Sequence, residues 1–252
     1  MCRHLGYLGP PLPLAELLLD PPHSLLQQTW APRDMRGGGT VNVDGFGAGW
    51  YEDGGEPARH RRAVPMWTDR SFAELARRQR SGAVLAAVRS ATVGMPVSEA
   101  ACAPFTDGRW LFSHNGVVAG WPESLAKAAA DLDVVDLMTL EAPTDSAVLW
   151  ALLRHRLHRG EDPARAVRAV VGQVVRTRPE SRLNLLLTDG SALVASTWGH
   201  ALSVRRTADS VLLSSEPFGD DARWEPVPGR HLGVARPGSV HVAPLLDEGE
   251  TP

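Results

Sequence analysis

The order of the hydrophobic patterns along the chain constrains its fold more than any other feature. Residues 145–158 and 164–176 both repeat apolar side chains at helical spacing, and Pro143 and Thr144 mark the start of the first pattern. After Pro179 the pattern changes to short apolar runs separated by turn dipeptides such as Asp-Gly and Pro-Gly. This order predicts an α+β chain, in which helices are segregated from largely antiparallel sheets.

The remaining patterns predict further strands and no linker. The expected strands are Arg3–Leu8, Phe46–Tyr51, Val64–Trp67, Ala83–Arg89, Trp110–Ser113, Leu183–Leu187, Leu193–Thr197, Leu202–Arg206, Val211–Ser214, Leu232–Ala235 and Ser239–Val242, with shorter helices near Leu14–Leu19 and Phe72–Arg78. We therefore expect a single domain over residues 2–252, with a polar, frayed tail.

Charge and composition exclude several classes of protein. The net charge of -3 provides no global basic field, so nucleic acid is not an expected partner. No apolar stretch is long enough to cross a membrane, and the N-terminus lacks the pattern of a signal peptide. Two cysteines cannot form a disulfide framework, which favours a reducing, cytoplasmic location.

Cys2 directly follows the initiator methionine, which gives its thiol an additional chemical option. A small residue at position 2 permits removal of Met1, and the thiol would then share its residue with a free α-amine. An α-amine has an intrinsic pKa of about 7.7–8.0, so it can accept the thiol proton without a histidine. Cys2 is therefore a candidate nucleophile; the alternative is a packing residue of the first strand.

The segment Ser113-His-Asn-Gly116 stands where an apolar strand pattern ends. The Asn115 amide and the Gly116 N–H can supply two donors to one oxygen, as an oxyanion hole requires. Asn-Gly is equally the commonest pair in a hairpin turn, and His114 can simply form local hydrogen bonds that position Asn115. Both interpretations remain open on these residues alone.

Two charged residues stand at the ends of predicted elements. Arg89 ends an apolar run and precedes Ser-Ala-Thr-Val-Gly94, a place suited to capture of a carboxylate. Asp145 lies in the first turn of its helix, where it can either stabilise the helix dipole or meet an ammonium group. An ordinary exposed arginine is the alternative for Arg89.

Taken in order, Cys2, Arg89-Ser-Ala-Thr-Val-Gly94, His114-Asn-Gly116 and Pro143-Thr-Asp145 resemble the class II glutamine amidotransferases, which are N-terminal nucleophile (Ntn) hydrolases. The glycine-rich segment 42–51 is similar to that of short bacterial members. The resemblance covers nearly the whole chain, and Cys2 with His-Asn-Gly is its most specific part. It implies a four-layer αββα sandwich, which agrees with the strand-rich pattern.

The resemblance also implies a reaction without metal or cofactor. In it the cysteine attacks the carbonyl carbon of a small-molecule γ-glutamyl amide, its α-amine moves the proton, and a thioester forms that water hydrolyses to glutamate. The implied catalytic residues are Cys2, Asn115 and Gly116, and the implied substrate-binding residues are Arg89 and Thr92 at the α-carboxylate, Asp145 at the α-ammonium, and His114.

The chain departs from the family pattern in two ways. The family loop usually reads Arg-Trp-Ala-Thr-His-Gly, whereas Ser90 and Val93 replace the Trp and the His. Smaller, less polar residues leave room for an amine larger than ammonia. In addition, no synthetase domain that would consume ammonia is expected after the last predicted strand. The chain is thus expected to hydrolyse a γ-glutamyl amide, or alternatively to supply ammonia to a separate synthetase.

Within the family, the Met1-Cys-Arg-His-Leu-Gly-Tyr-Leu-Gly9 start is most similar to short bacterial hydrolases of ergothioneine biosynthesis. In their reaction the leaving amine is a cysteine sulfoxide joined to a trimethylated histidine, and a quaternary ammonium favours aromatic walls. The loop Ser90–Val93 is expected to border this leaving group. The aromatic candidates are Trp30, Trp50, Tyr51 and Trp224.

Other functions have less support. Gly45-Phe-Gly-Ala-Gly49 lacks the spacing of a nucleotide-binding loop, and no strand–helix unit follows it. His155 and His158 form the only close histidine pair and lack acidic neighbours in a metal-binding pattern, so no metal site is expected. A non-catalytic binding protein with the same fold, and assembly into a homo-oligomer, both stay open.

Overall fold

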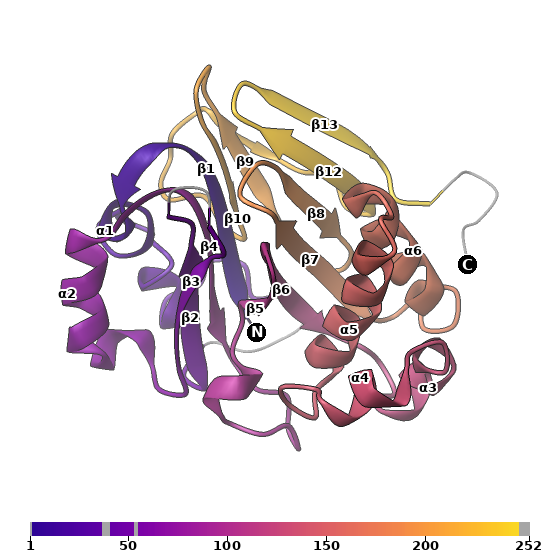
Figure 1. Cartoon of the computed structure of the whole chain (residues 1–252). Helices are drawn as coiled ribbons and strands as arrows, with labels where there is room; N and C mark the ends of the chain where they lie inside the picture. Colours follow the sequence, from indigo (N-terminus) through magenta and orange to yellow (C-terminus); the bar gives the residue numbers. More distant parts are fainter. Residues whose placement is uncertain (1, 37–40, 53–54, 247–252) are drawn as a thin grey trace.

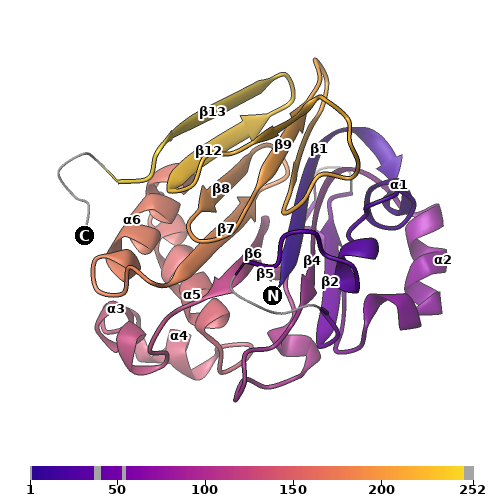
Figure 2. The same cartoon turned by 180° about the vertical axis from the view of Figure 1, so that it is seen from behind.

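The computed structural model describes residues 2–36, 41–52 and 55–246, which form two antiparallel sheets packed face to face (Figures 1 and 2). The first sheet has the order β11 (Trp224–Pro226), β9 (Ser203–Arg206), β10 (Val211–Ser214), β1 (Arg3–Pro13), β4 (Arg80–Arg89), β2 (Gly45–Trp50) and β3 (Ala58–Arg62). The second has the order β13 (Ser239–Pro244), β12 (His231–Arg236), β8 (Leu193–Thr197), β7 (Arg182–Thr188), β6 (Trp110–Val117) and β5 (Phe105–Asp107).

Helices cover both outer faces of this sandwich (Figure 1). α1 (Leu14–Leu18) and α2 (Arg70–Arg78) pack on the first sheet, whereas α5 (Asp145–His158) and α6 (Pro163–Val175) pack on the second. Two short helices, α3 (Ala126–Ala129) and α4 (Val134–Met138), lie beside α5. The predicted α+β class and the αββα sandwich are confirmed.

Three apolar layers hold the sandwich together, one at each interface between neighbouring layers. Leu8, Leu85, Leu111 and Leu186 fill the space between the sheets. Alternation along each strand sends the intervening side chains to the helices, so central strands such as β4 and β7 are buried on both faces. This explains why AVLAAVR in β4 reads as a continuous apolar run rather than an alternating one.

The helices begin where local chemistry places them. Thr144 caps α5 by accepting a hydrogen bond from the Ala147 N–H at 3.2 Å, as its sequence position predicts. Asp162 caps α6 in the same way, with Pro163 in its first turn. The Thr144 cap matters for function because it fixes the position of Asp145, the next residue.

One sequence-based expectation is wrong, and one alternative that the sequence left open is excluded. The predicted strand at Val64–Trp67 is absent, since this stretch ends in a 3-10 turn at Met66–Thr68 and the strand is β3, whose Arg-rich sequence ARHRR carries no apolar alternation. The His-Asn-Gly segment is not a hairpin turn. It lies inside β6, where Asn115 pairs with Asn184 of β7.

Residues 247–252, for which we expected a frayed tail, lie outside the described residues. Within the described part of the chain, no helix has the length and apolar character needed to span a membrane.

Candidate active site

Cys2 lies immediately before β1, at the end of the first sheet where β4 finishes. Arg3 pairs with Val88, so Cys2 is beside the β4 terminus at Arg89. Its half-buried Sγ lies 3.7 Å from the main-chain oxygen of Ser90, the first residue of the loop that follows. The thiol is free and not fully enclosed, so a small molecule can approach it.

Two adjoining small pockets open next to this thiol, of about 310 and about 330 Å³. Both pockets are lined by Cys2, Arg89 and His114. The smaller one is also lined by three further residues that the sequence predicts for the site. Six of the seven predicted site residues thus line one pocket, namely Cys2, Arg89, Thr92, His114, Gly116 and Asp145. The strands, the loop and the helix that carry them come from separate parts of the sequence.

Gly116 lines the pocket, and the strand pairing shows which way its main-chain N–H points. Leu183, which pairs with Gly116 across β6 and β7, donates its N–H to Trp198 on the opposite side at 2.7 Å. In an antiparallel pair, two directly opposed residues either both point their N–H groups toward the partner strand or both point them away from it. The Leu183 N–H points away from β6, so the Gly116 N–H points away from β7. On that side β5 pairs only as far as Phe112, which leaves the edge open.

Gly116 must also be glycine for a steric reason. A Cβ at this position would lie 1.8 Å from the main-chain oxygen of Arg182. The same oxygen accepts a hydrogen bond from His114 Nε2 at 3.0 Å. The close approach of β6 and β7 here therefore depends on the missing side chain.

His114 is held by the protein through both ring nitrogens. Its Nε2–H donates to the Arg182 carbonyl at 3.0 Å, and its Nδ1 lies within hydrogen-bond distance of the Ser146 hydroxyl at 2.9 Å. These two contacts tie β6 to the first turn of α5 and to the start of β7. The assignment of His114 to substrate binding stays a prediction, because in this arrangement the ring lines the pocket while its nitrogens bind protein groups.

Asn115 is the one predicted residue that lines neither pocket. Strand alternation sends it to the face opposite His114, toward the other sheet, where its Nδ2 donates to Ser215 Oγ over a long 3.5 Å. Its Oδ1 is buried and has no partner among the described residues. Its role as an oxyanion donor stays a prediction.

Asp145 is a buried carboxylate without a cationic partner in the described part of the chain. Its Oδ2 accepts from the Val118 N–H at 2.8 Å and its Oδ1 from the Ser146 N–H at 2.7 Å, while its exposed fraction is 4%. The helix N-terminus stabilises the charge in part. An ammonium group entering the pocket would supply the missing countercharge.

Arg89 has no carboxylate partner among the residues described. One of its nitrogens donates to the Pro96 carbonyl at 2.9 Å, which holds the guanidinium against the following loop. Asp44 fixes the same loop by accepting from the Ala91 N–H at 2.7 Å. Thr92 lines the pocket, whereas Val93 points fully into solvent.

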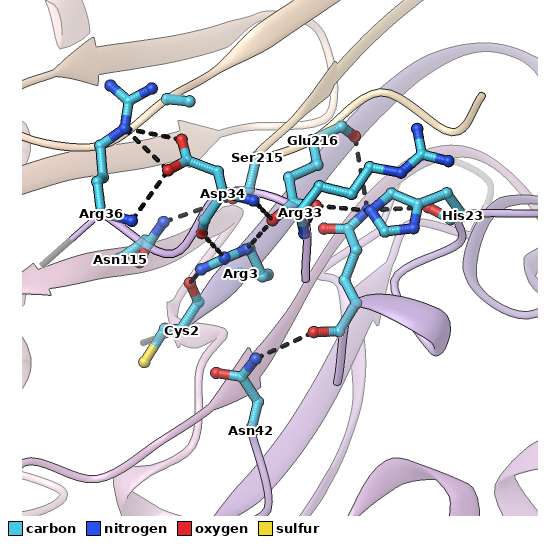
Figure 3. A network of polar contacts seen from close by, with 12 residues as sticks. Cys2, Arg3, His23, Arg33, Asp34, Arg36, Asn42, Asn115, Ser215 and Glu216 are labelled. Carbon is cyan, nitrogen blue, oxygen red and sulfur yellow. Dashed lines mark hydrogen bonds and ion pairs between the residues drawn. The ribbon is translucent and has the colours of Figure 1, made fainter. Parts of the chain in front are cut away.

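Sequence patterns missed the residues that hold the site from behind. Ser146 and Asp44 brace the site, and no local pattern marks them. A buried ion pair between Arg3 and Glu216 lies next to Cys2 (Figure 3), with Nε and Oε1 2.7 Å apart. No local sequence pattern marks this pair, because its two residues are 213 positions apart in the chain.

The aromatic candidates differ in their location. Trp50 is buried at the far end of β2, where it pairs with Val84, and the Tyr51 hydroxyl donates to the carbonyls of Arg109 and Thr188. Trp224 packs on Phe218 at the sheet edge. Trp30 is half exposed and packs edge-on against Trp67. It is the most exposed of the four, and none of the four lines either pocket beside Cys2.

Cys102 has no catalytic assignment, and its surroundings agree with a packing role. It is fully buried, and burial raises the pKa of its thiol to about 11. Elsewhere, the larger groove of the described surface lies between α3 and α6, is lined by arginines and contains none of the predicted site residues. No group of three potential ligands for a metal ion occurs among the described residues.

The family is established by comparison with known proteins. The model of the class II glutamine amidotransferases matches residues 23–211, well over half of the sequence. The chain therefore belongs to the class II glutamine amidotransferase family. The matched range begins after Cys2, so the assignment of the nucleophile depends on the pocket geometry and the order of the motifs.

A relative in Mycolicibacterium smegmatis, named Gamma-glutamyl-hercynylcysteine sulfoxide hydrolase, is 46% identical over 97% of this chain and 100% of its own. Among solved structures, a glutamine aminotransferase class-II domain protein from Silicibacter pomeroyi matches with a TM-score of 0.66, 23% identity and coverage of 97% and 99%. The glutamine PRPP amidotransferase of B. subtilis gives 0.71 at 12% identity, with 98% of this chain and 50% of that one covered. The two structures support the fold.

Proposed function

We propose that this chain hydrolyses the γ-glutamyl amide bond of γ-glutamyl-hercynylcysteine sulfoxide and releases glutamate and hercynylcysteine sulfoxide. The 46% identical relative carries the name of this activity and aligns along its entire length. The family assignment supports chemistry at a γ-glutamyl amide. The proposed reaction uses only this substrate and water, and it needs no cofactor.

One observation carries the proposal: the pocket beside the Cys2 thiol holds one cation and one anion that the described protein leaves without ionic partners. Arg89 and Asp145 both line it, and Asp145 is almost completely buried. Burying an unpaired carboxylate costs free energy unless a ligand supplies the opposite charge. An α-amino acid carries both required charges on one carbon, so a glutamyl head group fits.

In the proposed reaction, binding of the α-carboxylate by Arg89 and of the α-ammonium by Asp145 presents the γ-carbonyl carbon to Cys2. The sulfur attacks this carbon while its proton passes to the α-amine of Cys2, freed by removal of Met1. The C–N bond then breaks and the leaving amine takes the proton. Water attacks the thioester, glutamate leaves, and the thiol is restored.

The oxyanion formed in both steps needs donors that are already in place. The outward N–H of Gly116 is one, because β5 ends before reaching it. We infer that the Asn115 amide is the second, and that exchange of its long Ser215 contact for the oxyanion occurs in the transition state. Apo sites commonly show such catalytic hydrogen bonds long or misaligned.

The leaving amine would extend past the loop after β4. Ser90 is the residue next to the thiol here, and Val93 points away from the pocket, so neither side chain closes over the site. A site left open in this way accommodates an amine much larger than ammonia. Trp30 offers an aromatic face for its quaternary ammonium.

We also infer that residues 2–252 act as one domain, since β1 at the start of the chain lies between β4 and β10 in one sheet. A nucleophilic thiol must remain reduced, which supports a cytoplasmic location.

The decisive experiment is a release assay for glutamate with a panel of γ-glutamyl amides. The panel contains γ-glutamyl-hercynylcysteine sulfoxide, its analogue without the three N-methyl groups, γ-glutamylcysteine and glutamine. We expect the highest kcat/KM for the first compound. Equal or better use of glutamine would support the alternative of a glutaminase that supplies ammonia, and binding without turnover of any compound would support a non-catalytic protein.

A further inference from the structure

A buried set of ion pairs and hydrogen bonds lies directly behind the proposed nucleophile (Figure 3). Glu216 accepts from Arg3 Nε at 2.7 Å through one oxygen and contacts His23 Nε2 at 2.6 Å through the other. The main-chain N–H groups of Arg33 and Asp34 donate to the same carboxylate at 2.8 and 3.2 Å. Three other parts of the chain therefore meet at Glu216, namely Arg3, His23 and the main chain of residues 33–34.

This network is enclosed and ionised. Arg3, His23 and Glu216 are each 3% exposed. Burial opposes ionisation of Glu216, but the hydrogen bonds from His23 and Arg33 and the Arg3 guanidinium outweigh it and lower its pKa to about 2. Such a pair contributes little net folding energy compared with apolar packing, which suggests a role other than stability.

The network reaches Cys2 through its main chain. The Arg3 guanidinium donates to the Cys2 carbonyl at 3.0 Å, and its remaining nitrogen donates to the Asp34 carbonyl. Figure 3 shows the Cys2 carbonyl directed toward Arg3 and the sulfur directed away from it. The carbonyl carbon and the α-amine are bonded to the same Cα, so holding the carbonyl fixes the position of Cα and leaves only rotations about the Cα–C and Cα–Cβ bonds to place the amine and the thiol.

We propose that Arg3, held by Glu216, is a positioning residue that orients the Cys2 main chain and keeps its α-amine unprotonated at neutral pH. The guanidinium contacts the carbonyl of the residue that bears the amine, and a nearby cation disfavours the ammonium form of an amine. Glu216 limits the effect and prevents Arg3 from turning to solvent or to the substrate carboxylate. The inference depends on the proposed function, since it requires Cys2 to act through its α-amine.

Other titratable and charged groups also lie around Cys2. Those of the elements packed near it are Arg3 and His4 of β1, His23, Asp34, Arg89 of β4, Cys102, His114 of β6, Asp145 of α5 and Glu216. Arg89 and Asp145 have opposite charges and remain in every variant proposed below. A shift of the pH profile between wild type and a variant therefore reports the effect of the one charge that the substitution changed.

The test is the acid limb of the pH profile of kcat/KM, which reports the free enzyme's proton acceptor. Arg3→Gln removes the cation, and we expect the limb to move up by about one pH unit. Glu216→Gln leaves the cation uncompensated, and we expect the limb to move down. Arg3→Lys keeps the charge but cannot reach all three acceptors, so the limb should stay while kcat falls about tenfold.

The matched control is Arg154→Gln, which breaks an Arg–Asp136 pair of the same 2.7 Å length on α5 and should leave the limb and kcat unchanged. An unchanged limb in Arg3→Gln would overturn the inference, because a purely structural role lowers activity at every pH alike. Should Arg3→Gln not fold, as judged by circular dichroism, an unchanged limb in Glu216→Gln would overturn it equally. If the wild-type protein turns over the substrate but the acid limbs of the variants do not shift, the role of Arg3 is rejected and the proposed function stands. If the wild-type protein shows no turnover, the proposed function itself is rejected.

Discussion

The carboxylate of Asp145 accepts a hydrogen bond from the Val118 N–H, 2.8 Å away, and so joins the first turn of α5 to the end of β6. A side chain that the sequence marks only as a helix-start acid thereby becomes a fixed wall of the pocket beside Cys2. The contact orients the carboxylate without neutralising it. The site consequently offers a rigid anion to an incoming ligand.

Asp145→Asn should raise KM for the γ-glutamyl substrate about 100-fold with a smaller change in kcat, because the contact is remote from the scissile bond. Asn keeps one oxygen that can accept from the Val118 N–H but loses the acceptor for the Ser146 N–H, so circular dichroism should accompany the kinetics to check the fold. The matched control is Asp136→Asn, outside the pocket. A glutaryl amide, which lacks the α-ammonium, should show no difference between wild type and Asp145→Asn; a remaining difference would disprove the assignment.

Arg89→Met should likewise raise KM about 100-fold through loss of the α-carboxylate contact. A substrate without the α-carboxylate, a 4-aminobutanoyl amide, should be hydrolysed equally by wild type and variant. Combining the two variants with the two truncated substrates gives a double cycle that separates the two ends of the glutamyl group. If Asp145→Asn matched wild type on the substrate without the α-carboxylate, and Arg89→Met matched it on the substrate without the α-ammonium, the two assignments would have to be exchanged.

Cys2→Ala should lower turnover by about four orders of magnitude or more, because no other group replaces the nucleophile. Binding of the substrate, measured by isothermal titration calorimetry, should persist. Mass spectrometry of the wild-type protein should show an N-terminus that lacks Met1. A retained Met1 in active protein would rule out the α-amine as the base.

Ser90→Trp should narrow the side of the pocket next to the thiol. We expect kcat/KM for the bulky γ-glutamyl substrate to fall about tenfold relative to glutamine, since the added side chain competes with the larger leaving amine. Val97→Trp adds the same side chain to an exposed position of the loop outside the pocket and serves as the control. An equal loss for both substrates would show that the loop does not border the leaving group.

Stability should decline on mild acidification. Burial, followed by neighbouring positive groups, lowers the pKa of His4 and of His200 to about 3. The unfolded chain takes up these protons below about pH 6.5 and the folded chain does not, so the free energy of unfolding falls from there toward pH 3. Glu216 lowers the free energy of unfolding further below about pH 4.5, because its carboxylate is protonated in the unfolded chain there and stays ionised in the folded chain down to a pKa of about 2.

Urea unfolding between pH 7 and pH 5 measures this effect, because most carboxylates stay ionised in that range. His200→Gln should reduce the slope of the unfolding free energy against pH. His241→Gln, at an exposed position on β13, should not change it. A flat wild-type profile over this range would show that the buried imidazoles are not held neutral.

The elements that follow from sequence are those whose signals are local. The cap at Thr144, the apolar face of α5 and the continuous apolar run of β4 specify their own conformations, and all three were predicted. β3 was missed because the alternation that would reveal it is replaced by arginines that bind other segments, such as Arg61 with Glu141. His-Asn-Gly is ambiguous locally, and only pairing with β7 makes it a strand.

For the site, the sequence by itself determined which groups are chemically competent: a thiol next to the chain start, an Asn-Gly pair, and an arginine and an aspartate at element ends. The tertiary structure decided which of them share a pocket, which way the Gly116 N–H points, and that Arg3 and Glu216 meet behind Cys2. The reason is physical. A residue's reactivity and preferred turn are local properties, whereas its neighbours depend on strand order and burial, which the whole chain sets together.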